Sequence, residues 1–83
     1  MDYFYVYVIR SIVFERNYVG FTKDVESRLM EHNSGKTQST RPYIPWKLVF
    51  FEKFSAKVEA IKREKFLKSG QGRDYVKHKL LAS

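Results

Sequence analysis

The stretch from Tyr3 to Ile9 constrains the fold of this chain more than any other feature. All seven residues are aromatic or β-branched, a composition typical of β-strands. Because both faces of such a strand are apolar, we expect it to lie at the centre of a sheet with cover on both sides. This is the longest apolar run, far shorter than the ~20 residues of a membrane-spanning helix. The sequence therefore predicts a protein that does not cross a membrane.

The rest of the chain divides into segments with distinct hydrophobic patterns. The further predicted elements are strands at 17–21 and 46–54 and helices at 24–33, 56–68 and 73–81. Asp24 is a suitable N-cap for the first helix, and Gly35 lies just beyond its end. We expect Ser55 to cap the second helix and Gly70 to end it. The order strand, strand, helix, strand, helix, helix predicts an α+β fold: a three-stranded, mainly antiparallel sheet flanked by helices, forming a single domain over residues 1–83.

The composition favours a cytoplasmic protein that binds a polyanion. The chain has no cysteine, whereas small secreted domains usually depend on disulfides. Its net charge is +7, and residues 53–83 contain nine basic and only three acidic side chains. Basic charge concentrated in one part of a small domain is typical of nucleic-acid binding. The alternative is a solvated helix face that only keeps the protein soluble.

Glu64 is the residue most at odds with its surroundings. Ala60 and Leu67 lie on the apolar face of the predicted helix at 56–68, and Glu64 falls between them on that face. A carboxylate in such a place is unfavourable unless it is paired or holds a metal ion. The alternative is that a basic side chain such as Lys57 or Lys68 neutralises it.

Other candidate residues are weaker signals when each is taken alone. Arg28 and His32 are four residues apart and share a helix face, where they suit phosphate binding and proton transfer. They are equally compatible with an exposed arginine and a partly buried histidine. Tyr7 and Tyr18 lie on the first two strands, where tyrosines usually pack. Gly20 inside a strand indicates a bulge or the close approach of another group.

Read in order, these residues form a recognisable series. The motifs are Tyr5-Val6-Tyr7, then Tyr18-Val19-Gly20 followed by Phe21-Thr22, then the helix pattern of Arg28, His32, Asn33 and Gly35, and finally Glu64 after the third strand. Over roughly residues 3–68 the series resembles the GIY-YIG nuclease domain. The likeness is greatest to short bacterial proteins that resemble the nuclease module of the excision-repair nuclease subunit.

The resemblance implies an enzyme, a divalent-metal-dependent endonuclease that hydrolyses DNA phosphodiester bonds and leaves a 5′-phosphate and a 3′-hydroxyl. It implies a role in DNA repair or recombination, on DNA that is branched or contains single strands. The catalytic residues would be Tyr7, Tyr18, Arg28, His32 and Glu64. Glu64 would be the protein ligand of one Mg²⁺ or Mn²⁺ ion, and either tyrosine could be the general base. Supporting residues would be Gly20, Thr22 and Asn33, and contacts with the DNA backbone would come from Lys36, Arg41, Lys62, Lys65, Lys68 and Arg73.

Three other interpretations fit parts of the sequence. One is a nucleic-acid-binding module of the same fold that cleaves weakly or not at all. Another is an RNA-binding domain whose sheet presents Phe4, Tyr5 and Tyr7 as an open stacking platform. A third is a structural or protein-interaction domain, which has only the small size and basic surface in its favour.

Overall fold

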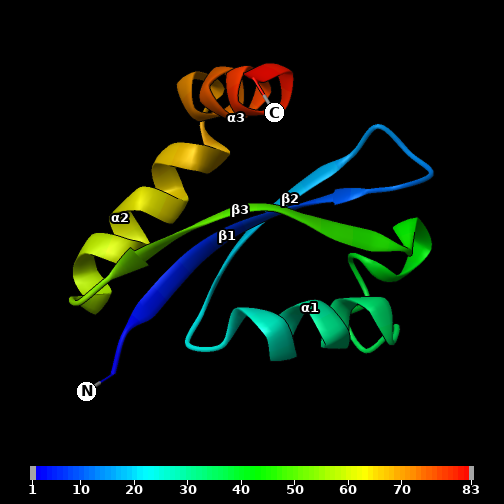
Figure 1. The fold of residues 1–83 in the computed structure, drawn as a ribbon, viewed down its shortest axis with the longest axis horizontal. Helices are drawn as coiled ribbons and strands as arrows, with labels where there is room; N and C mark the ends of the chain where they lie inside the picture. Colours follow the sequence, from blue (N-terminus) through cyan, green and yellow to red (C-terminus); the bar gives the residue numbers. More distant parts are fainter. Residues whose placement is uncertain (1, 83) are drawn as a thin grey trace.

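The computed structural model describes residues 2–82 and contains one three-stranded antiparallel sheet with helices on both sides (Figure 1). The strands are β1 (Phe4–Ser11), β2 (Asn17–Thr22) and β3 (Trp46–Phe54), and the α-helices are α1 (Val25–Asn33), α2 (Lys57–Lys68) and α3 (Gly70–Ala82), with a short 3₁₀ helix at Arg41–Tyr43. The predicted fold class and element order are confirmed.

The strand order is β2-β1-β3, so the doubly apolar strand is central, as its composition predicted. Alternate residues of β1 enter two hydrophobic clusters on opposite faces of the sheet. Val6 and Val8 pack against α2 and α3 residues that include Leu67, whereas Tyr7 and Ile9 pack in a cluster that includes Trp46. In Figure 1, α1 lies on one side of the sheet and α2 and α3 lie on the other.

The third strand does not alternate simply. Strict alternation would place Leu48 and Phe50 on the same side of the sheet. A register shift lies between Val8 and Ile9, so Phe50 pairs with Val8 and Leu48 pairs with Ile9. Such a bulge adds a residue to one strand, and as a result Phe50 packs in the cluster beneath α2 and Leu48 in the opposite one.

The first helix begins and ends at the residues that its sequence pattern indicates. Asp24 accepts a hydrogen bond from the Ser27 backbone amide at 3.1 Å, which satisfies one of the free amides of the first turn. The Thr22 hydroxyl accepts from the Asp24 amide at 3.1 Å and so fixes the link between β2 and α1. Gly35 has φ +84°, the left-handed conformation that follows many helix ends.

The two C-terminal helices differ from the sequence prediction at their ends. The N-cap of α2 is Ala56 rather than Ser55, and no side chain caps that end. Gly70 is the first residue of α3 rather than the terminator of α2, because Ser69 adopts an extended conformation between the helices. The Ser69 hydroxyl then accepts a hydrogen bond from the Gly72 amide at 3.2 Å and so satisfies a free amide in the first turn of α3. α3 therefore starts three residues earlier than Arg73.

An ion pair fastens α2 to the sheet. The Arg63 guanidinium donates to both carboxylate oxygens of Glu52 on β3, at 2.7 and 3.1 Å. Hydrogen bonding to Glu52 raises the pKa of Arg63 above its usual value, against the effect of burial. The bidentate contact holds α2 in a defined register, and Glu64 is the next residue along this helix.

Two of the three aromatic residues that an RNA-binding platform would use are occupied by contacts within the fold. Tyr7 is buried, and Phe4 packs against the hydrophobic cluster beneath α2. Within residues 2–82 there is no helix with the length and apolar character needed to cross a membrane.

Candidate active site

Tyr7 lies at the centre of the candidate site. Its side chain is 2% exposed, and its hydroxyl is 2.8 Å from Nε2 of His32 on α1. His32 is itself fully buried, although the helix pattern alone left it as a partly buried residue. The strand and the helix are thus joined by a hydrogen bond between two groups that can exchange a proton.

Gly20 makes room for this hydrogen bond. It pairs with Tyr7 across the two strands, and the phenol ring lies over it. A Cβ atom built at Gly20 would overlap the hydroxyl oxygen and Cζ of Tyr7 and lie 2.7 Å from its Cε1 atom. The glycine therefore marks a close approach, one of the two readings that the sequence left open.

Tyr18 completes an aromatic group at the β2 edge of the sheet. Its ring centroid lies 4.9 Å from that of His32 and 6.3 Å from that of Tyr7. Tyr18 is only half-buried, and it lines a surface groove. Of the two tyrosines, Tyr18 is the more open to a ligand and Tyr7 is the one bonded to the histidine.

Two charged residues act on the Tyr7 hydroxyl. Burial raises its pKa to about 12, hydrogen bonding with Arg28 acts to lower it, and the charge of Glu64 acts to raise it. Arg28 also forms an ion pair with Glu31 at 2.9 Å. Burial opposes the charge on Arg28, but the contacts with Tyr7 and Glu31 outweigh it and raise its pKa. Arg28 thus lies within hydrogen-bonding reach of the Tyr7 hydroxyl, whereas Glu64, on α2, acts on it only weakly and through its charge.

Glu64 is partly withdrawn from solvent, and a lysine neutralises it. Its side chain is 22% exposed and lies 3.2 Å from Nζ of Lys68, one turn further along α2. This is one of the pairings that the sequence left open as an alternative to a metal. Lys68 is 53% exposed, and exposed pairs of this kind contribute less than about 1 kcal/mol. The contact is therefore weak enough for a cation or a phosphate to replace it.

The donor set fits a cation of the magnesium type. In residues 2–82 no three His, Cys, Asp or Glu side chains gather into a metal-binding group, so the protein alone would offer Glu64. Mg²⁺ commonly binds through one or two carboxylates, with waters and substrate phosphate as its other ligands. A single carboxylate whose charge reaches Tyr7 is compatible with an ion that binds together with the substrate.

A second contact to His32 could not be predicted from the sequence. Its Nδ1 atom is 2.8 Å from Oγ1 of Thr40, which is 1% exposed although it belongs to the polar segment after α1. Trp46 holds the same segment in place by donating from Nε1 to the Thr40 carbonyl at 2.9 Å. A threonine in a polar loop carries no pattern that distinguishes it from its neighbours.

The three predicted supporting residues have structural contacts. Asn33 bridges α1 to β3, since its Oδ1 accepts from the Trp46 amide at 2.6 Å and its Nδ2 donates to the Trp46 carbonyl at 3.0 Å. Thr22 organises the start of α1, and Gly20 accommodates Tyr7. Each of them fixes an element that carries a candidate catalytic side chain.

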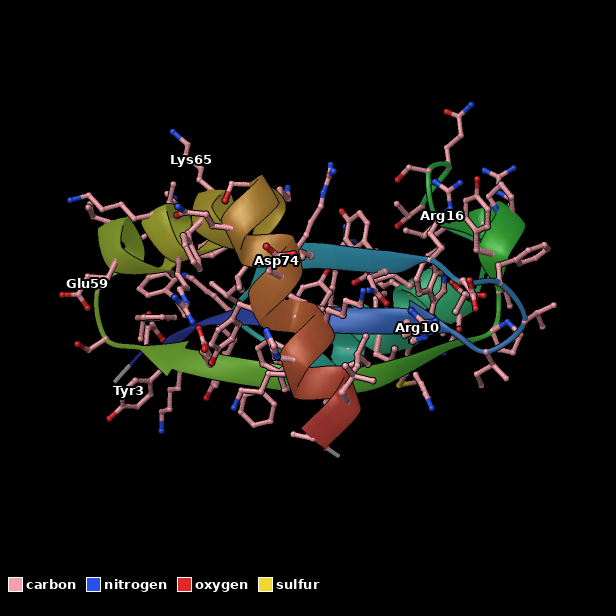
Figure 2. The ribbon with its side chains drawn as sticks, turned by 90° about the horizontal axis from the view of Figure 1, so that it is seen from above. Tyr3, Arg10, Arg16, Glu59, Lys65 and Asp74 are labelled. Atoms are coloured by element: carbon pink, nitrogen blue, oxygen red, sulfur yellow. The ribbon has the colours of Figure 1, made fainter. Side chains whose placement is uncertain are left out.

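A groove of about 580 Å³ adjoins the site, between the β1–β2 hairpin and the α2–α3 junction. Tyr18 and three basic residues, Arg16, Lys68 and Arg73, are among the residues that line it. Figure 2 shows that Arg16, on the hairpin, and Lys65, on α2, both lie toward the β2 edge of the sheet. Positive charge therefore borders the edge at which Tyr18 is exposed.

The six predicted DNA-contacting residues are all exposed, but they belong to two separate parts of the chain. Lys62, Lys65, Lys68 and Arg73 are on α2 and α3, whereas Lys36 and Arg41 follow α1. Arg41 donates from Nε to the Gly35 carbonyl at 3.0 Å and is the more constrained of that pair. Arg16, which the sequence did not single out, joins the first group at the groove.

Comparisons with known proteins identify the family of this chain. A family model described as the GIY-YIG catalytic domain matches residues 3–77. A UPF0213 protein of Haloquadratum walsbyi is 44% identical over 69 residues, covering 82% of this chain and 76% of the relative. A UPF0213 protein of Staphylococcus saprophyticus is 37% identical over 70 residues, covering 83% and 84%. The solution structure of a UPF0213 protein from Bacillus halodurans superposes with a TM-score of 0.55 at 32% identity, covering 89% of this chain and 81% of that one.

Proposed function

Because this chain belongs to the GIY-YIG family, whose domain has a nuclease-type fold, we propose that it is a divalent-metal-dependent DNA endonuclease. It hydrolyses phosphodiester bonds and leaves a 5′-phosphate and a 3′-hydroxyl. One observation carries the proposal: His32, Arg28 and Glu64 all act on the buried hydroxyl of Tyr7. A tyrosine whose role is only packing does not require a base, a guanidinium and a carboxylate that all act on its hydroxyl.

Tyr7 and His32 move the proton of the attacking water. A pKa of about 12 keeps the phenol neutral, so free phenolate is too scarce to act as the base. The Tyr7 oxygen instead accepts the water proton while its own proton passes to Nε2 of His32, 2.8 Å away. Burial, with Arg28, lowers the pKa of His32, so its ring is neutral and free to accept near pH 7.

Arg28 directly, and Glu64 through the ion that it would hold, stabilise the negative charge that develops during the reaction. The Arg28 guanidinium stabilises the phenol oxygen as its proton leaves and the negative charge that builds up on the phosphate. Glu64 would hold one Mg²⁺ or Mn²⁺ ion once Lys68 releases its carboxylate. When bound there, such an ion would supply Lewis-acid stabilisation of the scissile phosphate and of the leaving 3′ oxygen.

The basic groove supports a nucleic-acid substrate. Lys68 and Arg73, with Arg16, are placed to contact phosphates beside Tyr18, and such contacts supply affinity without reading sequence. We extend the proposal to DNA that is branched or contains single strands, and to a cytoplasmic role in repair or recombination. The resemblance to the nuclease module of the excision-repair subunit supports the extension.

A binding module without cleavage is the second candidate. It is favoured by the Glu64–Lys68 ion pair, which satisfies the carboxylate without any metal. The two candidates share the basic groove and differ only in whether the ion pair opens.

Incubation with end-labelled linear, flap and branched DNA, in Mg²⁺ and in Mn²⁺, distinguishes them. We expect cleavage in at least one metal, products that a ligase can rejoin, and complete loss of activity in EDTA. DNA that is bound but uncut in both metals would favour the binding module. Cleavage that EDTA leaves intact would contradict the metal-dependent reaction.

A further inference from the structure

We infer that Thr40 is a positioning residue that fixes the tautomer of His32, with the proton on Nδ1 and the lone pair of Nε2 facing Tyr7. For its catalytic consequence this inference rests on the proposed function. The tautomer itself can be measured on the free protein without any cleavage.

The three side chains form a buried chain of hydrogen bonds. Tyr7 Oη and His32 Nε2 are 2.8 Å apart, His32 Nδ1 and Thr40 Oγ1 are 2.8 Å apart, and Thr40 Oγ1 is 3.4 Å from the Thr37 carbonyl. A neutral imidazole has one N–H, so a proton on one nitrogen makes the other an acceptor. The direction of the whole chain is therefore set by whether Thr40 accepts from His32 or donates to it.

Counting donors selects one direction. If His32 Nδ1–H donates to Thr40, the threonine hydroxyl can donate to the Thr37 carbonyl, and the Tyr7 hydroxyl donates to Nε2. In the reverse direction His32 donates to Tyr7, and the Tyr7 proton then has no acceptor among the hydrogen bonds of the described residues. A buried phenol proton without an acceptor is unfavourable, so the first direction is the more stable one.

The position of Thr40 is itself well determined. The side chain is 1% exposed, and its carbonyl accepts from the Trp46 indole at 2.9 Å. Its amide donates to the Thr37 carbonyl at 3.2 Å, within the turn that precedes the short 3₁₀ helix. The backbone of Thr40 is therefore held in place by these two contacts, and its buried hydroxyl lies against His32.

The consequence for catalysis concerns one proton. When water attacks, the Tyr7 oxygen gains a proton from it and loses its own to Nε2, so His32 becomes an imidazolium with protons on both nitrogens. The Nδ1 proton stays on its nitrogen and remains bonded to Thr40. This transfer needs an empty Nε2, which is the state that Thr40 enforces.

The test compares Thr40→Val with Thr40→Ser. Valine keeps the β-branched shape and the backbone bond to Trp46 but has no oxygen, whereas serine keeps the oxygen and loses a methyl group. Long-range ¹H–¹⁵N spectra of ¹⁵N-labelled protein at pH 8 report which ring nitrogen carries the proton, and His78→Gln assigns the signals of the only other histidine.

We expect the Nδ1–H form in the wild type and in Thr40→Ser, and a shift toward Nε2–H in Thr40→Val. Cleavage should fall roughly 10- to 100-fold in Thr40→Val and stay within about threefold in Thr40→Ser, the range typical of residues that orient a reacting histidine. An Nε2–H tautomer in the wild type, or no change in Thr40→Val, would overturn the inference. If the wild type has the expected tautomer but does not cleave DNA, the proposed function is rejected, while the effect of Thr40 on the His32 tautomer is still supported.

Discussion

Replacing Gly20 with alanine tests how closely the sheet is built around Tyr7. The new Cβ atom would lie 2.7 Å from Cε1 of Tyr7, and ordinary contact begins at 3.4 Å, so the ring must move by at least the difference of 0.7 Å. A displacement of this size is enough to disrupt the 2.8 Å hydrogen bond between Tyr7 and His32. Overpacking costs about 1–3 kcal/mol and the lost hydrogen bond about 1 kcal/mol. We expect Gly20→Ala to lower stability by about 2–4 kcal/mol.

Thermal and urea denaturation of Gly20→Ala, a control variant and a double-mutant cycle measure the effect. For a domain of this size 1 kcal/mol corresponds to about 4–8 °C, so the Tm of Gly20→Ala should fall by at least about 8 °C. Gly70→Ala is the matched control, because nothing lies within 4 Å of its Cβ position, and we expect it to leave the Tm unchanged or to raise it slightly. In a Tyr7→Leu background Gly20→Ala should cost much less, with a coupling energy of about 1–3 kcal/mol. An equal cost in both backgrounds would refute the steric reasoning.

Two further predictions concern the elements that carry the site. Asn33→Ala should destabilise the protein by about 1–3 kcal/mol, because it removes both hydrogen bonds to the Trp46 backbone, whereas Asn17→Ala, which loses one exposed contact, should change stability by less than about 0.5 kcal/mol in urea denaturation. Burial, followed by the nearby charge of Arg28, lowers the pKa of His32 in the folded state. Stability should therefore be retained above the unfolded value of about 6.5 and decline as the pH falls below it. His32→Gln should remove this dependence and His78→Gln should preserve it; a pH profile that is the same in all three proteins would contradict the assignment.

The fold could be predicted from the sequence because its strongest signals are local. The apolar run of β1, the Asp24 cap and Gly35 each act on their own segment, and the structure confirms them. The errors at Ser55 and Gly70 have one cause. Serine and glycine suit several positions near a helix end, so residue type alone does not decide which position they occupy.

For the candidate site, the sequence predicted which residues take part but not all of the contacts between them. Arg28, His32 and Glu64 could be selected by motif and by the misfit of a carboxylate in an apolar stripe. In the structure His32 and Arg28 form hydrogen bonds with Tyr7, and Glu64 acts on it only through its charge. Thr40 could not be selected, because it contacts His32 only where the loop after α1 folds back onto that helix. The spacing of residues in the sequence does not predict such a contact. The bulge in β3 was missed for the same reason: its register is set by the partner strand.

Cleavage by Glu64→Gln, compared with Glu59→Gln on the same helix, tests the central claim most directly. Both variants remove one negative charge from α2, but Glu59 is exposed in the first turn. Loss of the exposed ion pair to Lys68 should change stability by less than about 1 kcal/mol, so folding will not confound the result. We predict that Glu64→Gln cleaves labelled DNA at least about 100-fold more slowly, with Glu59→Gln close to wild type. Equal rates for wild type and Glu64→Gln in saturating Mg²⁺ would show that the carboxylate beside Tyr7 is not part of a hydrolytic centre.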